Sequence, residues 1–207
     1  MQIAIPVFDE MTALDAVGPY EVLSRVPGAT VTWVGLTPEP VRADRGLRLV
    51  PDAVLEDVPS PDVLVFGGGF GTRALARDER VLDWVRGVHA GSQWTASVCT
   101  GAIVLGAAGL LDGLNATTHW AVYDELAATG AIPVAQRIVE HDRIMIGAGV
   151  SAGIDMALLL VARMTHENVA RAIQLGIEYD PQPPFDAGTP VKAGPELVEL
   201  VRAHGLD

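Results

Sequence analysis

Short apolar runs alternate with segments of helical periodicity along this chain of 207 residues. The four clearest runs cover residues 2–7, 30–36, 62–66 and 94–98. Runs that are apolar at nearly every position indicate strands buried on both faces, which is typical of a parallel sheet covered by helices. We therefore predict an α/β fold of the flavodoxin-like, doubly wound kind, with a mostly parallel sheet and helices on both of its faces.

The stretches between these runs predict the helices and the remaining strands. Helices are expected at residues 12–26, 74–89, 151–164 and 166–179. The first of these should turn four apolar side chains toward the core, namely Leu14, Val17, Val22 and Leu23. A hairpin is expected at residues 41–50, and a strand pair at residues 138–141 and 144–146.

The chain is expected to form one α/β domain over residues 1–190, followed by a C-terminal extension over residues 191–207. Residues 181–190 are rich in proline and should wrap the surface without regular structure. The extension is predicted to form a short helix at residues 195–204. We find neither an internal repeat nor a linker that would divide the domain.

Charge and hydropathy exclude several classes of partner. The chain has 14 Lys and Arg against 26 Asp and Glu, a net charge of −12, so nucleic acid would be repelled. Its longest apolar run, residues 102–111, is much shorter than the roughly 20 residues that cross a bilayer. The first residues also lack the basic region of a secretory signal, so we expect a soluble, cytoplasmic protein with no membrane partner.

The chain contains a single cysteine, Cys99, which excludes an internal disulfide and a multi-thiolate metal site. Cys99 lies where an apolar run gives way to a helical stretch of small residues. The unpaired N–H groups at the start of a helix favour a thiolate, so this is a position suited to a nucleophile. The alternative is a buried cysteine that acts only as a small hydrophobic residue.

A run of glycines at residues 67–69 and 71 follows the third apolar run. Adjacent glycines let backbone N–H groups approach a ligand, so Gly68 and Gly69 are candidates for stabilising negative charge on a substrate. The alternative is a tight turn. The run matches neither a phosphate loop nor the dinucleotide-binding spacing, which makes ATP and NAD poor candidates for a cofactor.

Four further residues are candidates near the thiol. Asp15 has apolar neighbours and is either a proton-transfer group for Cys99 or a plain helix cap. His119 is the histidine most suited to pair with the thiol, although neighbouring threonines favour a structural role. Ser151 is expected to cap the buried helix at residues 151–164, and it lies with Val150 in a possible wall of the pocket.

These residues resemble those of the PfpI/ThiJ family, in the class I glutamine-amidotransferase-like superfamily, and in particular its isocyanide-hydrating members. The resemblance runs from about residue 3 to about residue 190. It is carried by Leu14-Asp15, Gly18-Pro19, Ser97-Val98-Cys99-Thr100-Gly101, residues 105–111, Ala116-Thr117-Thr118-His119-Trp120, residues 152–155 and the segment from Glu178-Tyr179 to Gly188. Residues after 190 and the detail of Val150-Ser151 lie outside it.

The resemblance implies a cysteine nucleophile elbow at Cys99, an acid/base at Asp15 and a supporting Thr100. It implies hydration of a small isocyanide to an N-substituted formamide through a thioimidate on Cys99, with charge stabilised by N–H groups of Gly68, Gly69 and Thr100. Neither a metal nor an organic cofactor is expected. The resemblance also implies a homodimer, and Thr100 in place of the histidine of related proteases argues against peptidase chemistry.

Two alternatives remain open from the sequence. The same thiol in a glyoxalase- or deglycase-like enzyme would attack a reactive aldehyde. A non-catalytic redox or stress sensor would instead carry a thiol that is oxidised to the sulfinic acid.

Overall fold

The computed structural model describes residues 1–204 and centres on a seven-stranded sheet. The neighbouring pairs in this sheet are parallel except β10 with β11, which is antiparallel. Across the sheet the strands follow the order β10 (Ile138–His141), β11 (Ile144–Gly147), β7 (Trp94–Val98), β6 (Val63–Phe66), β1 (Gln2–Pro6), β2 (Thr30–Gly35) and β5 (Ala53–Val54). The predicted doubly wound, mostly parallel fold is confirmed.

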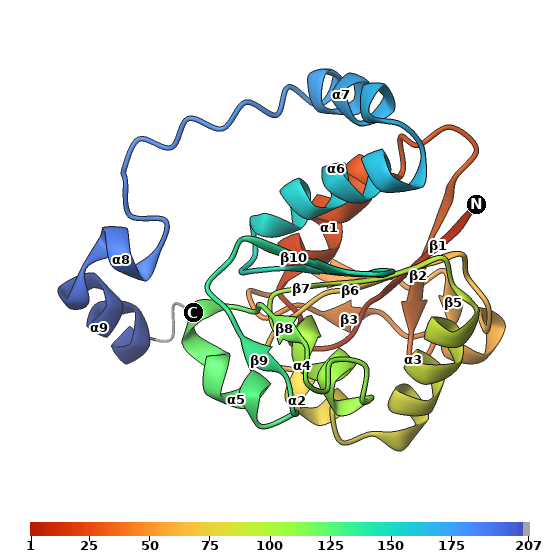
Figure 1. The fold of residues 1–207 in the computed structure, drawn as a ribbon. Helices are drawn as coiled ribbons and strands as arrows, with labels where there is room; N and C mark the ends of the chain where they lie inside the picture. The colour runs from red at the N-terminus through yellow and green to blue at the C-terminus, as the bar shows by residue number, and fades with distance from the viewer. Residues whose placement is uncertain (205–207) are drawn as a thin grey trace.

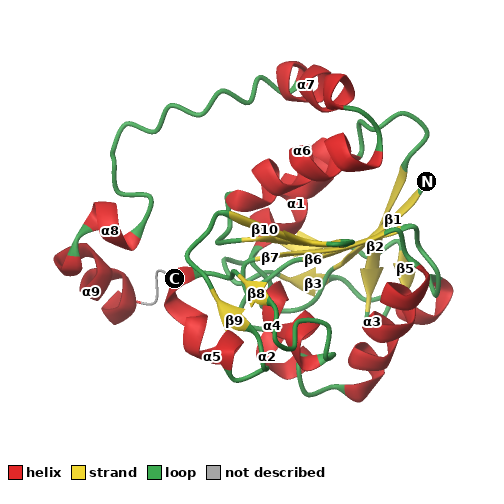
Figure 2. Cartoon of the chain, viewed as in Figure 1, coloured by secondary structure: helices red, strands yellow, loops and turns green. Residues whose placement is uncertain are grey.

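Helices cover both faces of the sheet (Figures 1 and 2). One face carries α1 (Ala13–Leu23), α6 (Ala152–Met164) and α7 (Glu167–Gly176). The other face carries α2 (Thr72–Leu75), α3 (Glu79–Gly91), α4 (Gly101–Ala107) and α5 (Tyr123–Ala127). The core lies between these layers, and all four residues of β6 are buried, as its unbroken apolar run predicted. All four residues of β11 are buried as well, and β10 with β11 forms the strand pair expected near residues 138–146.

Smaller elements complete the fold. The predicted hairpin is confirmed as β3 (Val41–Arg42) and β4 (Arg48–Leu49), which pair antiparallel. Some small elements were not predicted, namely the parallel pair β8 (Asn115–Ala116) and β9 (Ile132–Pro133) and two single-turn helices at Leu55–Asp57 and Trp120–Val122. Two short C-terminal helices follow, α8 (Pro190–Ala193) and α9 (Pro195–His204).

Three sequence-based expectations need correction. The helix expected at residues 74–89 is two helices, because Asp78 accepts a hydrogen bond from the N–H of Arg80 at 3.0 Å and begins α3 afresh. Leu14 and Val17 do not belong to the core, since Leu14 is 42% exposed and Val17 is only half-buried. Residues 181–189 lack regular structure, as expected, but they are exposed and run away from the domain in Figure 1 instead of wrapping it.

The expected C-terminal extension, residues 191–207, is described only as far as residue 204. Within the described part of the chain, no helix has both the length and the apolar character needed to cross a membrane.

The sheet brings the carboxyl ends of β6 and β7 together. Phe66, the last residue of β6, is paired with Ser97 in β7, and Val98 is paired with Gly147 in β11. The glycine run therefore leaves β6 beside the point where Cys99 leaves β7. Parallel sheets bind ligands at this edge.

Candidate active site

Cys99 occupies the turn between β7 and α4 in a strained backbone conformation. Its φ is +56°, in the left-handed region that residues with a side chain rarely adopt. The turn is fixed on both sides, since the N–H of Cys99 donates to the carbonyl of Ala148 at 2.7 Å and its carbonyl accepts from the Thr118 hydroxyl at 2.8 Å. This strand–turn–helix geometry is that of a nucleophile elbow.

Asp15 lies against the Cys99 thiol from the first turn of α1 and is fully buried. The loop before α1 is held to the glycine run, because the N–H of Thr12 donates to the carbonyl of Gly68 at 2.9 Å. In return the N–H of Gly68 donates to Oδ2 of Asp15 at 2.8 Å. Oδ1 has no partner at hydrogen-bonding geometry among the described residues.

Burial raises the pKa of Asp15 to about 7, although hydrogen bonds from Gly68 and from the Cys99 thiol act in the opposite direction. A carboxyl group with this pKa can accept or release a proton at neutral pH. Its position against the thiol therefore suits proton transfer, and Asp15 does not cap α1, whose N-cap is Thr12.

The expectation of a thiolate favoured by the helix start is wrong for the resting protein. Burial raises the pKa of the Cys99 thiol, and the neighbouring Asp15 carboxyl raises it further. The backbone N–H groups of Thr100 and Val150 donate toward the sulfur and oppose this shift without outweighing it. In the resting pair the thiol therefore keeps its proton, and above about pH 7 the negative charge lies on the Asp15 carboxylate.

The two glycine N–H groups are not free to stabilise charge on a substrate, which corrects the role expected for them. Gly68 donates its N–H to Asp15, and Gly69 donates its N–H to the hydroxyl of Thr100 at 2.8 Å. The same hydroxyl donates to the carbonyl of Gly69 at 3.1 Å. The glycine run and Thr100 therefore position the carboxyl and the elbow, while N–H groups of Thr100 and Val150 face the sulfur.

The substitution Gly68→Ala tests this arrangement, because the structure leaves no space for a methyl group at that position. A Cβ there would lie 2.5 Å from the Thr100 nitrogen and 2.8 Å from Oδ2 of Asp15. We expect Gly68→Ala to displace the carboxyl and to lower kcat/KM by about 100-fold or more, since small misplacements of reacting groups have effects of that size. The measurement is kcat/KM for an aryl isocyanide, the class of substrate that the resemblance implies.

Gly87→Ala is the matched control, because a Cβ at that position on α3 meets nothing within 4 Å. We expect it to retain full activity and to gain up to about 1 kcal/mol in free energy of unfolding, since alanine favours helices over glycine. Equal activity in the two variants would contradict the positioning role of Gly68.

Of the other expected site residues, His119 lies in the cavity beside the thiol and Ser151 does not. His119 lines the same small cavity as Cys99, and its ring lies against Gly149 and the ring of Trp120. Its Nδ1 accepts from the N–H of Ala121 at 3.4 Å. Ser151 is exposed and does not line this cavity; it is the N-cap residue of α6, but its side chain makes no capping hydrogen bond.

The cavity at Cys99 has a volume of about 30 Å³. Besides Gly69, Cys99, Thr100 and His119 it is lined by four residues that the sequence did not single out, Thr12, Phe70, Arg73 and Val122. Arg73 bonds Glu125 at 2.7 Å, and its guanidinium lies 5.5 Å from the centre of the Phe70 ring. Of these four residues, only Phe70 could have been predicted from the sequence, because it lies inside the glycine run.

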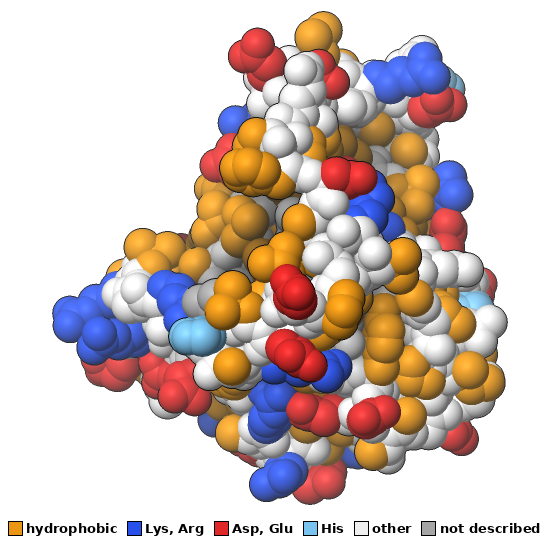
Figure 3. Space-filling model, turned by 90° about the vertical axis from the view of Figure 1, so that its left-hand side faces the viewer, with side chains coloured by type: hydrophobic (Ala, Val, Ile, Leu, Met, Phe, Trp, Pro, Cys, Tyr) orange, Lys and Arg blue, Asp and Glu red, His pale blue; other side chains and the backbone are white. Residues whose placement is uncertain are grey.

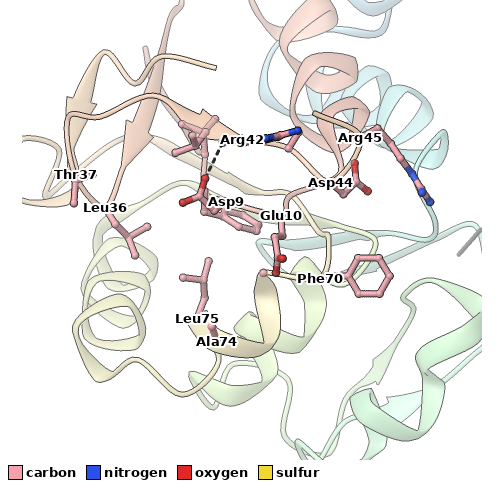
Figure 4. Close-up of a pocket in the computed structure, with 15 residues that line it drawn as sticks. Asp9, Glu10, Leu36, Thr37, Arg42, Asp44, Arg45, Phe70, Ala74 and Leu75 are labelled. Carbon is pink, nitrogen blue, oxygen red and sulfur yellow. Dashed lines mark hydrogen bonds between the residues drawn. The ribbon is translucent and has the colours of Figure 1, made fainter. Parts of the chain in front are cut away.

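A second and larger cavity of about 880 Å³ adjoins the ends of β1 and β2 (Figure 4). Carboxyl groups of Asp9, Glu10 and Asp44 line it together with Arg42 and Arg45. Phe70 lines both cavities, and in Figure 4 its ring lies at the edge of the larger one, across from Leu36. Over residues 1–204, no group of three or more His, Cys, Asp or Glu side chains is arranged to hold a metal ion.

Comparison with known proteins gives consistent matches over most of the chain. Residues 1–163 match the model of the DJ-1/PfpI family. The isonitrile hydratase of Pseudomonas putida is 43% identical over 202 residues, which are 98% of this chain and 89% of that enzyme. The transcriptional regulator CdhR of Pseudomonas aeruginosa is 31% identical over 183 residues, but these cover only 52% of the regulator.

Among solved structures, a ThiJ/PfpI family protein from Pseudomonas syringae superposes with a TM-score of 0.92 at 40% identity. The match covers 98% of this chain and 86% of that protein. The whole described domain, with its C-terminal helices, therefore has a close structural counterpart.

Proposed function

The chain belongs to the DJ-1/PfpI family, and from this membership we propose that it hydrates an isocyanide to an N-substituted formamide. The observation that carries the proposal is the buried Asp15 carboxyl against the thiol of Cys99 at a strained elbow. The similarity to an isonitrile hydratase over nearly the full chain supports the choice of substrate. Cys99 is proposed as the nucleophile, Asp15 as the acid/base and Thr100 as a positioning residue.

In the first step, sulfur adds to the terminal carbon of the isocyanide. The Asp15 carboxylate accepts the thiol proton as the carbon–sulfur bond forms, and it delivers this proton to the same carbon. The product is a thioimidate, R–N=CH–S–Cys99, in which the elements of the thiol have been added across one carbon. The N–H groups of Thr100 and Val150 stabilise negative charge on the sulfur during the transfer.

In the second step, water attacks the thioimidate carbon. Asp15 takes a proton from the water and delivers it to the nitrogen, which gives a tetrahedral R–NH–CH(OH)–S–Cys99 and restores the carboxylate. Collapse of this intermediate returns the hydroxyl proton to sulfur through Asp15 and releases R–NH–CHO. One isocyanide and one water are consumed, and this scheme uses neither a metal nor an organic cofactor.

The test is a pair of assays on the same purified protein. We expect loss of an aryl isocyanide with stoichiometric appearance of the N-aryl formamide, identified by mass. Methylglyoxal should be turned over far more slowly. Faster turnover of methylglyoxal would favour a glyoxalase, and ready peroxide oxidation of Cys99 without turnover of either compound would favour a sensor.

We also propose that the protein works as a homodimer. Leu14 on α1 is 42% exposed, and Leu14 and Ile154 of α6 both lie within 4 Å of a Cβ placed at Gly18, so they form one apolar strip. Seen from the side of α8 and α9, hydrophobic side chains gather on the face below α7 (Figure 3). Sedimentation should give twice the 21.8 kDa chain mass, and Leu14→Glu should shift it toward the monomer.

A cytoplasmic location is part of the same proposal. A catalytic thiol must remain reduced, and the cytosol favours that state. Localisation of a tagged protein in fractionated cells tests this.

A further inference from the structure

The cavity beside Cys99 is too small for a whole substrate. Its volume of about 30 Å³ admits only a few small atoms, by comparison with the space that a single water needs. On the function proposed above, the linear isocyano group enters this cavity and the substituent on its nitrogen lies outside. The residues at the mouth therefore decide which substituents are accepted.

The opening of the cavity beside Cys99, its mouth, carries the exposed aromatic ring of Phe70, which neighbouring side chains hold in place. Phe70 is 44% exposed although it follows three buried glycines, and it lines the cavity together with Cys99. The Arg73 guanidinium lies 5.5 Å from the centre of the ring. Glu125 fixes that guanidinium through an ion pair at 2.7 Å. A ring that is restrained in this way loses little freedom when a ligand packs on it.

The charges at the mouth favour a neutral partner for this ring. The Arg73 charge is balanced by the Glu125 carboxylate, so this ion pair offers no net positive charge that would attract an anionic substituent. The net charge of −12 acts in the same direction over longer distances. Val122 and His119 also line the cavity, the first with an apolar side chain and the second with a flat ring.

From these contacts we propose that Phe70 is the binding residue for the substituent, and that the preferred substrates are isocyanides with neutral aromatic substituents. The substituent packs on the Phe70 ring while the isocyano carbon reaches Cys99. This proposal rests on the isocyanide hydratase function, and it adds the class of substituent and the residue that selects it.

The test compares three substrates in the wild type and in Phe70→Ala, namely phenyl, methyl and 4-carboxyphenyl isocyanide. The wild type should prefer the phenyl compound to both others. In Phe70→Ala, kcat/KM for the phenyl compound should fall about tenfold, mostly through KM, as expected for the loss of one aromatic contact and the area it buries. The value for the methyl compound should stay within about twofold, because it makes little contact with the ring.

Two further variants keep the result interpretable. Phe70→Leu retains an apolar side chain without a flat ring and should give an intermediate loss for the phenyl compound. Leu175→Ala removes a side chain that is 81% exposed on α7, and it should leave kcat/KM unchanged for both the phenyl and the methyl compound. Equal losses for the phenyl and methyl compounds, or no loss for either, would overturn the role of Phe70. Absence of turnover of all three compounds in the wild type would instead refute the proposed function.

Discussion

Cys99→Ala is expected to lower isocyanide turnover by at least about 10⁴-fold, since loss of a nucleophile in covalent catalysis has effects of that order. Cys99 is the single cysteine of the chain, so no other thiol can replace it. The side chain is small and 5% exposed, and its replacement leaves the backbone bonds of the elbow intact. The variant should therefore fold. The measurement is the initial rate of formamide formation, with far-UV circular dichroism to check the fold.

Ser97→Ala is the control for this variant. Ser97 lies two residues before Cys99 in β7, is fully buried, and its hydroxyl has no hydrogen-bond partner among the described residues. Its removal should leave the rate unchanged and should not lower stability, because an unpartnered buried hydroxyl contributes no favourable bond. A Cys99→Ala protein that retains more than a few per cent of the rate would refute the covalent scheme.

Asp15→Asn is expected to lower the rate by about 10²- to 10⁴-fold, the range for loss of a general acid or base. The pH dependence should change as well. Because the pKa of Asp15 is raised to about 7, the pair holds both protons below that pH and contains no base. In the wild type, kcat/KM should therefore rise as the pH increases through about 7, and the residual activity of Asp15→Asn should lack this step.

Asp15→Asn should lower activity but raise the stability of the folded protein. A carboxyl whose folded pKa is raised from 3.8 to about 7 favours the folded state most below the unfolded value, and this contribution is lost as the pH rises through the folded value. The burial of Asp15 should therefore cost the wild type about 4 kcal/mol more at pH 8 than at pH 4, at about 1.4 kcal/mol per unit. Asp15→Asn should gain free energy of unfolding relative to the wild type over this range.

Urea unfolding at pH 4 and pH 8 measures the change in free energy of unfolding for the wild type and for Asp15→Asn. The other titrating groups are the same in both proteins, so their contributions cancel when the two changes are compared. Asp83→Asn provides the control, because its carboxylate is exposed on α3. It should leave both the activity step and the stability difference as in the wild type. An Asp15→Asn protein less stable than the wild type at pH 8, with an unchanged pH profile, would show that Asp15 has only a structural role.

The sheet was predictable because burial on both faces leaves a direct mark on the sequence. Strands such as β6 and β7 consist almost wholly of buried residues, so an unbroken run identifies them without knowledge of their neighbours. The break between α2 and α3 was missed because helical periodicity continues across it and the cap at Asp78 is a single side chain. The exposure of Leu14 depends on what packs on α1, which periodicity does not report.

The site was predictable in its members but not in its electrostatics. Cys99 and Asp15 follow β7 and β1, so their meeting at one edge of the sheet follows from topology. The direction of the thiol pKa depends on how completely the sulfur is buried and on the approach of a carboxyl group, both set by packing. The partners of the Gly68 and Gly69 N–H groups are likewise tertiary contacts.

A single-turnover experiment follows the sulfur of Cys99 itself and shows whether a covalent intermediate forms on it. Excess wild-type protein is mixed with phenyl isocyanide, quenched in acid at intervals, and digested for mass spectrometry. We expect the peptide with Cys99 to gain the mass of one isocyanide and to lose it at the rate at which the formamide appears. Formamide that appears while this peptide remains unmodified at every time point would rule out a covalent intermediate on Cys99.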